Sequence, residues 1–303
     1  MKTKDRPLES HTSVISSFMD FANVPEKERE LLKRELKRYI ETRIVKGKWC
    51  HPFITKFHTD WYREFYRIID GTDPYKLIKD NSNIQAKQLL KNFKSDSIRD
   101  SVMLTIIGNK IDFGACMDSI YNLEQLKADI QNVKRENFSV NQVEEMLSEI
   151  KSAKNVLYLF DNNGEMIFDT LLLDFIVKHV DKKNVFLVGK DKPMLNDVTV
   201  ADLKSEKLDE FGLIVSTGSD CFGLHEEDVS DDFKKLLKSA DLIIAKGQAY
   251  LEFFSEYNFT NVFHVLRVKQ EIVGDELPTL TPGMNVVMKS TNYAGKGVDY
   301  VWS

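Results

Sequence analysis

From residue 155 onward, short apolar runs alternate with segments of helical periodicity, and this alternation restricts the fold more than any other feature. The runs span residues 155–160, 184–188, 212–216, 241–245, 261–268 and 285–288. Strands that alternate with helices form βαβ units, and such units build a mainly parallel sheet with helices on its faces. The sequence therefore predicts an α/β fold for residues 153–303.

The preceding part of the chain has helical periodicity. Phe53, Phe57, Trp61 and Phe65 recur at every fourth position, which places them on one face of a helix. An aromatic stripe of this kind is typical of a buried helix face rather than of a cofactor site. We therefore predict an all-α subdomain over residues 1–152 that packs onto the sheet domain as a cap.

Two motifs in this helical part predict helix boundaries. Ser139 followed by Gln142 matches a capping box, which predicts a helix from this point to about residue 152. In the segment 108–114, two glycines bracket Asn109 and Asp112, which predicts a helix end with polar side chains on the bend that follows. On spacing alone, this second motif is simply a capped helix end.

Charge and composition exclude several classes of protein. With 42 basic against 47 acidic residues the net charge is −5, whereas a general nucleic-acid-binding protein is normally basic. No apolar run approaches the about 20 residues of a membrane helix, and residues 1–10 lack the apolar core of a signal peptide. We therefore expect a cytoplasmic protein without a nucleic-acid or membrane partner. The sequence does not predict the oligomeric state.

The cysteines form no recognisable metal-binding or redox pair. Cys50, Cys116 and Cys221 are widely spaced and odd in number, so they match neither a Cys-x-x-Cys motif nor a disulfide framework. We expect structural thiols. Cys221 and His225 would form a zinc site only with a second pair of ligands, which the sequence does not offer.

Polar residues follow the predicted strands at the points where the strands end. In strand order they are Asp161-Asn162, Asn196-Asp197, Ser219 and Lys246. Loops after parallel strands converge at one edge of the sheet, where α/β proteins bind ligands. Carboxylate and amide oxygens suit Mg²⁺ or Mn²⁺, and a lysine before a helix-opening glycine suits a phosphate oxygen. The residues therefore predict a site for a cation and a phosphate.

Some of these residues have simpler interpretations. Asn196-Asp197 is equally well a helix cap. Glu165 and Asp169 lie in the first turns of a predicted helix, where acidic side chains interact favourably with the helix dipole, and we prefer that interpretation to ligation. The glycines of the loop 217–223 are expected to let backbone N–H groups approach an anion.

Several enzyme classes lack their required motifs in this chain. There is no Gly-x-x-x-x-Gly-Lys-Ser/Thr loop and no Gly-x-Ser-x-Gly elbow, which excludes P-loop enzymes and α/β hydrolases. No Gly-x-Gly-x-x-Gly follows the first strand, which disfavours dinucleotide binding.

The motifs taken together resemble those of the damage-control phosphatases, a metal-dependent family first described as domain of unknown function 89. In the second half they are Asp161-Asn162-x-Gly164-Glu165, Asn196-Asp197-Val198-Thr199 and the segment 240–249 with Glu252. In the helical half they are Asp73-Pro74-Tyr75 with Lys79 and Asn83, and Gly108-Asn109-x-Ile111-Asp112. The match covers roughly residues 50–290.

The resemblance implies a fold and a function. Family members combine a helical subdomain with a three-layer, Rossmann-like α/β/α domain. They are cytosolic phosphatases that use Mn²⁺, Co²⁺, Ni²⁺ or Mg²⁺ on small phosphorylated metabolites, including sugar phosphates and damaged or surplus intermediates. By motif position, the metal ligands would be Asp161, Asn162 and Asp197, Lys246 would contact the phosphate, and Asn109 and Asp112 would line the substrate pocket. We also expect Glu165 and Ser219 to contact the substrate.

The chain departs from the family pattern in features that bear on the substrate. The microbial and archaeal subfamily often carries cysteine pairs near its amino terminus, and these are absent here. Its Lys-Cys after the fifth strand is Lys269-Gln270, and the Arg-Thr-x-Lys signature of the sugar-phosphate subfamily is missing. The predicted metal ligands are all present, so the departures leave the metal site intact and the physiological substrate open.

We therefore predict a metal-dependent phosphoric monoester hydrolase with Asp161, Asn162, Asp197 and Lys246 as its catalytic residues. The cation would neutralise charge on the transferring phosphoryl group, and Lys246 would bind one of its oxygens. The Asp-x-Asp of aspartate-nucleophile phosphatases is missing because Asn163 stands at its third position, which favours attack by water over a phospho-enzyme.

Two alternatives from other classes remain. An S-adenosylmethionine-dependent methyltransferase would need a glycine-rich loop after the first strand and an acidic residue at the end of the second. Here Gly164 is isolated and the second strand ends in Gly189-Lys190. The other alternative is a non-catalytic protein that binds a metal or a phosphorylated metabolite on the same scaffold.

Overall fold

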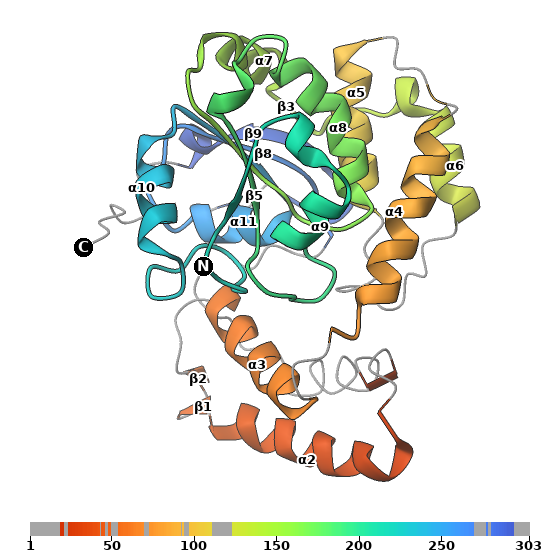
Figure 1. Ribbon diagram of the computed structural model, residues 1–303, viewed down its shortest axis with the longest axis vertical. Coiled ribbons are helices and arrows are strands. Elements are labelled where there is room, and N and C mark those ends of the chain that lie inside the picture. Colours follow the sequence, from red (N-terminus) through yellow and green to blue (C-terminus); the bar gives the residue numbers. More distant parts are fainter. Residues whose placement is uncertain are drawn as a thin grey trace.

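The chain folds around a seven-stranded sheet that has helices on both faces (Figure 1). The computed structural model describes residues 19–20, 24–42, 44–45, 48–49, 54–69, 73–91, 93, 97–110, 123–269, 277 and 280–293. Within these ranges, none of the helices combines the length and the apolar character needed to cross a membrane.

The strand order in this sheet is β3-β9-β8-β7-β4-β5-β6. The strands that run parallel to one another are β4 (Val156–Leu159), β5 (Val185–Gly189), β6 (Leu213–Ser216), β7 (Leu242–Lys246) and β8 (Val262–Arg267). β9 (Asn285–Lys289) is antiparallel to β8, and the short β3 (Val140–Asn141) is parallel to β9. The predicted mainly parallel sheet is confirmed, because each predicted strand is present with bounds that differ by one residue at most.

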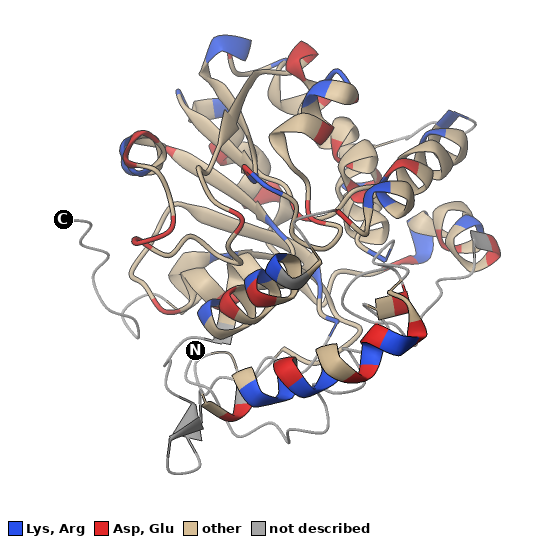
Figure 2. Cartoon of the chain, turned by 60° about the horizontal axis from the view of Figure 1, so that its bottom comes forward, with Lys and Arg blue, Asp and Glu red and all other residues tan. Residues whose placement is uncertain are grey.

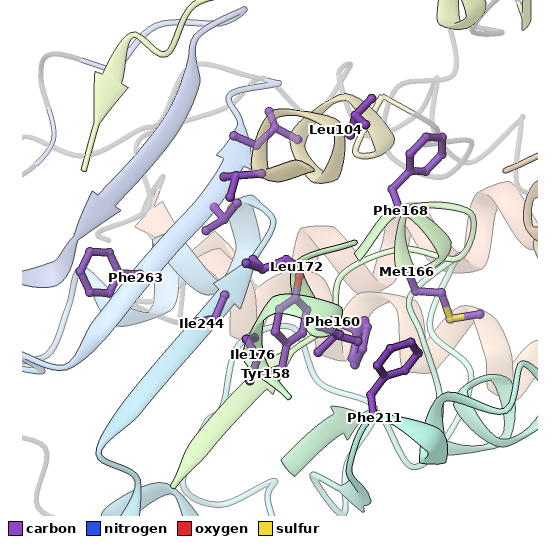
Figure 3. Close-up of a cluster of buried hydrophobic side chains, with 14 of the residues drawn as sticks. Leu104, Tyr158, Phe160, Met166, Phe168, Leu172, Ile176, Phe211, Ile244 and Phe263 are labelled. Atoms are coloured by element: carbon purple, nitrogen blue, oxygen red, sulfur yellow. The ribbon is translucent and has the colours of Figure 1, made fainter. Parts of the chain in front are cut away.

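Both faces of the sheet are buried because side chains of the central strands alternate between two apolar clusters. In β4, Val156 and Tyr158 pack with α5 (Ile98–Gly108), α7 (Val143–Ser152) and α8 (Glu165–Ile176). Figure 3 shows Tyr158 in this cluster together with Leu104 of α5 and Leu172 of α8. Leu157 and Leu159 pack with α10 (Asp231–Ser239) and α11 (Gln248–Phe254) on the other face. The three-layer α/β/α arrangement is therefore confirmed.

The amino-terminal part contributes further helices. They are α2 (Glu26–Thr42), α3 (Ile54–Ile68), α4 (Lys76–Lys91) and α6 (Leu123–Gln131). α2 carries charges of both signs along its length, whereas the strands of the sheet carry few (Figure 2). Phe57, Trp61 and Phe65 of the predicted aromatic stripe are buried in α3, where they share one apolar cluster with Leu195 and with Leu251 of α11. Phe53 lies outside the described residues. α3 therefore packs against the sheet domain beside the loop that follows β5.

Short elements complete the described chain. They are the paired strands β1 (Ile44–Val45) and β2 (Lys48–Trp49), α9 (Val200–Ser205), and the 3-10 helices η1 (Val133–Arg135), η2 (Lys182–Asn184), η3 (Leu208–Glu210) and η4 (Ser290–Asn292).

The predicted helix to residue 152 is present as α7, but the structure differs from the sequence expectation at two points in the helical part. At the predicted capping box, Val140 and Asn141 form β3 beside β9, and Ser139 N–H donates to Asn285 O at 2.8 Å. α7 consequently begins only at Val143. The pairing of β1 with β2 also interrupts the helices. Local spacing could not reveal β3, because its partner strand lies far along the chain.

The sheet order creates a topological switch point between β4 and β7. The chain passes from β4 to β5 and β6 on one side, and then returns to β7 and β8 on the other. Parallel sheets bind ligands outside the carboxyl ends of the strands at such a point. Asp161 follows β4 and Gly247 follows β7, so the predicted site lies at this switch point.

Candidate active site

The two loops that carry the predicted metal ligands lie side by side. Asn162 and Asp197 pair in an isolated antiparallel bridge, and Val198 N–H donates to Asp161 O at 2.9 Å. The structure thus brings together Asp161, Asn162 and Asp197 from the loops that follow the neighbouring strands β4 and β5.

The Asp161 carboxylate is held by two amides and by a close approach of the backbone. Its Oδ2 atom accepts hydrogen bonds from Asn109 Nδ2 at 2.8 Å and from Asn162 Nδ2 at 2.7 Å. A Cβ atom at Gly247 would lie only 2.1 Å from Asp161 Cγ, and the φ angle of +82° at this position also favours glycine. Position 247 therefore has to be a glycine, because a larger residue would overlap the Asp161 carboxylate.

Asn109 reaches this site from the helical part. It is the C-cap residue of α5, and its amide nitrogen donates both to Asp161 and to Glu165 Oε2. The approach depends on Gly108, where a Cβ atom would lie 2.9 Å from the ring of Phe168 in α8. Among the described residues, Asn109 Oδ1 is buried and has no hydrogen-bond partner. The predicted helix end thus also delivers a side chain to the site.

Lys246 is fully buried, and its ammonium group contacts oxygen atoms inside the fold. It donates to Thr105 O at 3.0 Å and forms ion pairs with Glu165 and, at 3.0 Å, with Asp169. Two of these contacts, to Thr105 O and to Glu165, are hydrogen bonds, and the third is an ion pair by distance. Glu165 and Asp169 therefore do more than face a helix dipole, because they share a buried positive charge.

Burial and neighbouring charges both shift the pKa values of Asp169 and Lys246. Burial raises the pKa of Asp169 to about 7, while the charge of Lys246 opposes that increase and the charge of Glu165 adds to it. For Lys246, burial alone would lower the pKa, but the charges of Asp169 and Glu165 outweigh it and raise the pKa. Lys246 consequently stays protonated in the folded protein.

A second lysine contacts a predicted metal ligand directly. Lys190, the residue after β5, places its Nζ atom 3.4 Å from Asp197 Oδ2 and 5.4 Å from the centre of the Phe222 ring. It also donates to Cys221 O. Lys190 is not among the site residues predicted from the sequence, although its position directly after a strand is the same signal that identified Asp161.

The loop after β6 is held by its own side chains and by α3. Ser219 Oγ accepts from Cys221 N–H at 3.0 Å and from Arg63 at 3.3 Å, and Arg63 also pairs with Asp220 and Asp228. Side-chain oxygens of the protein itself accept from the N–H groups of Gly218, Ser219, Cys221 and Phe222. This loop therefore does not present these four N–H groups to an anion, contrary to the expectation.

Asn196 and Asp197 do not cap the helix that follows them. The N-cap residue of α9 is Thr199, which exchanges hydrogen bonds with Asp202 in a capping box. The Asp197 carboxylate is therefore not used by that cap. Asp112, the other predicted pocket residue besides Asn109, lies outside the described residues, as do Cys50 and Cys116.

The described part of the chain contains no cluster of three or more His, Cys, Asp and Glu side chains that could hold a metal. A zinc site at Cys221 and His225, which the sequence did not favour, is not supported by the structure either, because His225 Nε2 lies 2.9 Å from Thr55 Oγ1 in a buried contact. Asp161, Asn162 and Asp197 do not form such a cluster, because one of the three residues is an asparagine.

These three residues nevertheless fit a divalent cation. The amide nitrogen of Asn162 donates to Asp161, so the amide oxygen is the end of that side chain that can serve as a ligand. Two carboxylates and an amide oxygen are hard ligands suited to Mg²⁺ or Mn²⁺. Carboxylates also outnumber ammonium groups around the switch point, so a cation would neutralise excess negative charge.

The fold and this arrangement define an α/β protein with an acidic, cation-compatible site at the switch point of its sheet. The chain belongs to the family with the damage-control phosphatase ARMT1-like domain, whose model matches residues 7–281. The family resemblance seen in the motifs is therefore confirmed.

Similar proteins agree with this membership. A protein of undetermined function from Methanocaldococcus jannaschii is 34% identical over 291 residues, which cover 91% of this chain and 92% of that protein. A damage-control phosphatase from Pyrococcus horikoshii is 33% identical over 219 residues, or 71% of this chain and 75% of that protein. A crystal structure of a P. horikoshii protein of the domain-of-unknown-function-89 family has a TM-score of 0.82 and 27% identity, covering 96% of this chain and 99% of that one. The relatives support a phosphatase role in metabolite repair.

Proposed function

We propose that the chain is a metal-dependent phosphatase that hydrolyses phosphate monoesters of small metabolites, such as sugar phosphates or damaged and surplus intermediates. The observation that carries this proposal is the convergence of Asp161, Asn162 and Asp197 at the switch point, with Lys190 beside Asp197. Oxygen ligands for a cation next to an ammonium group are what the transfer of a phosphoryl group requires. The family membership supports the same activity.

Each side chain of the site has a role in this proposal. Asp161, Asn162 and Asp197 would hold Mn²⁺, Co²⁺, Ni²⁺ or Mg²⁺, which when bound supplies Lewis-acid stabilisation of the phosphoryl charge. Asn109 fixes the orientation of the Asp161 carboxylate, and Glu165 orients Asn109. Asp112 and Ser219 remain proposed substrate contacts.

We assign the contact with the phosphoryl oxygen to Lys190 instead of Lys246. The ammonium group of Lys246 is buried against Thr105 O, Glu165 and Asp169, and it would have to leave these partners to reach a substrate. Lys190 donates to Cys221 O, but its one carboxylate partner in the described part of the chain, Asp197, lies 3.4 Å away and is itself a proposed metal ligand. A cation on Asp197 would weaken this ion pair and make the Lys190 ammonium group available to the phosphate.

The test is a phosphatase screen on metal-stripped protein, with p-nitrophenyl phosphate and a panel of phosphorylated metabolites. Mn²⁺, Co²⁺, Ni²⁺ and Mg²⁺ are added separately. We expect the stripped protein to be inactive and at least one metal to raise the rate by about 100-fold or more. Release of phosphate that is independent of metal would contradict the proposal. Methyl transfer from S-adenosylmethionine by the same preparation would favour the methyltransferase alternative.

Lys190→Met is expected to weaken substrate binding and to tighten metal binding. Loss of a charged hydrogen bond to the phosphate should lower kcat/KM by about 10- to 100-fold, mainly through KM. Loss of a positive charge beside Asp197 should tighten Mn²⁺ binding by about two- to fivefold. Steady-state kinetics and an electron paramagnetic resonance titration of free Mn²⁺ measure the two effects separately.

Lys192→Met provides a matched control, because Lys192 is an exposed lysine in the same loop. It should leave both KM and the Kd for Mn²⁺ unchanged. If Lys190→Met weakened Mn²⁺ binding, or left KM at the wild-type value, the assignment of Lys190 to the phosphoryl group would be wrong.

A further inference from the structure

Asn163 lies directly after two of the proposed metal ligands, and its side chain joins the two loops of the site. The residue is 1% exposed. Its Nδ2 atom lies 3.1 Å from Asn196 O, 3.3 Å from Asp197 O and 3.2 Å from Asp202 Oδ2. The backbone adds a hydrogen bond from Asn163 N–H to Asn196 O at 2.9 Å. The backbone that carries Asp197 is therefore held by the residue that follows Asp161-Asn162.

The other end of the Asn163 amide is held by α4. Asn163 Oδ1 accepts from Asn83 Nδ2 at 3.1 Å, and Asn83 Oδ1 accepts from Gly164 N–H at 2.6 Å. Both asparagines are buried, and hydrogen bonds in such an environment are stronger than in water. A single residue of α4 thus fixes both the Asn163 side chain and the backbone that follows it.

The far side of this network is also fixed. Asp202 Oδ2 accepts from Thr199 N–H at 2.9 Å and from Thr199 Oγ1 at 2.8 Å, in addition to its contact with Asn163. Lys79 of α4 lies 4.0 Å from the same oxygen. Since Asp202 belongs to the capping box of α9, it cannot shift without disturbing the start of that helix. The contacts form a continuous chain from α4 through Asn163 to the loop of Asp197.

We propose that Asn163 is a positioning residue, which sets the spacing between Asp161-Asn162 and Asp197 and makes the affinity for a divalent cation depend on α4. This role rests on the proposed cation site, but Asn163 is not itself a ligand. Its amide oxygen and nitrogen are both engaged within the fold, and it acts on Asp197 through the backbone.

Asn163→Asp separates positioning from a purely electrostatic role. The substitution keeps the shape but replaces the amide donor by an oxygen, which would face two carbonyl oxygens and the Asp202 carboxylate. A purely electrostatic role predicts tighter cation binding, because a negative charge is added near the site. A positioning role predicts weaker binding in spite of that charge, because the loops are pushed apart.

The experiment measures Mn²⁺ binding by electron paramagnetic resonance in the metal-stripped full chain, without reference to enzymatic activity. We expect Asn163→Ala and Asn163→Asp to raise the Kd for Mn²⁺ by about 10- to 100-fold, as substitutions behind metal ligands usually do. Asn83→Ala should change the Kd in the same direction. The matched control is Asn285→Ala, which removes a buried asparagine that contacts Asn137 O and Glu136 in another part of the sheet. It should leave the Kd unchanged.

Failure of the positioning role of Asn163 and failure of the cation site give different results. If wild-type protein binds no Mn²⁺, the proposed cation site itself fails. If wild-type protein binds Mn²⁺ and Asn163→Ala binds it equally well, the positioning role is overturned while the cation site stands. Tighter binding by Asn163→Asp would overturn it as well. Circular dichroism verifies the fold of each variant, and Asn83→Ala, which retains Asn163, decides the question if neither Asn163 variant folds.

Discussion

Asp161→Asn is expected to lower kcat/KM for phosphate esters by about 1,000-fold and to abolish measurable Mn²⁺ binding. The substitution removes one of the two charges that would hold the cation. The substitution also affects the second oxygen of the side chain. Asp161 Oδ2 accepts hydrogen bonds from Asn109 and Asn162, so the oxygen of an asparagine would turn toward these donors. Its NH₂ group would then replace the other carboxylate oxygen, and an NH₂ group does not bind a cation. Kinetics with p-nitrophenyl phosphate and a Mn²⁺ titration measure the two losses.

Asp241→Asn is the matched control for this prediction. Asp241 precedes β7, at the opposite edge of the sheet, and its Oδ2 atom accepts from Lys154 N–H at 3.2 Å and from Asn155 N–H at 2.7 Å. The chemical change is the same, but the residue is exposed and remote from the switch point. We expect wild-type activity. If Asp161→Asn retained wild-type activity in correctly folded protein, Asp161 would not be a metal ligand.

The sheet and the grouping of the candidate site residues could be predicted because both depend on local patterns. A strand buried on both faces must be apolar at every position, so the run that became β4 is visible without knowledge of its neighbours. Parallel strands also place their carboxyl ends at one edge, so Asp161 and Asp197 could be grouped from their positions after strands. The structure confirms that they lie together.

The partners of these residues could not be predicted, because they depend on contacts between distant segments. Nothing near Lys246 in the sequence shows that its side chain points into the core, since its partners Glu165 and Asp169 belong to α8. The same holds for Asn163, whose neighbours include Asn83 of α4. The sequence places chemically suitable residues at strand ends, whereas the direction of each side chain is set by packing.

Lys246→Met is expected to lower the free energy of unfolding by about 3–5 kcal/mol, the usual effect of leaving buried charges without their partner. Glu165 and Asp169 would then lie together in the core without a positive charge. Methionine has a similar length to lysine, so a cavity contributes little to the loss. Since domains are stable by only about 5–15 kcal/mol, urea unfolding followed by circular dichroism will detect it readily.

A rescue experiment identifies the cause of this destabilisation. Adding Glu165→Gln and Asp169→Asn to Lys246→Met removes the buried charges, and we expect part of the lost stability to return because neutral groups are less costly to bury. Lys235→Met, on an exposed position of α10, should leave the unfolding midpoint unchanged. If Lys246→Met instead unfolded at the wild-type urea concentration and raised KM, the ammonium group would contact the substrate phosphate as the motif resemblance implied. The two possible roles of Lys246 can therefore be told apart, because loss of an internal counter-ion lowers stability, whereas loss of a phosphate ligand raises KM.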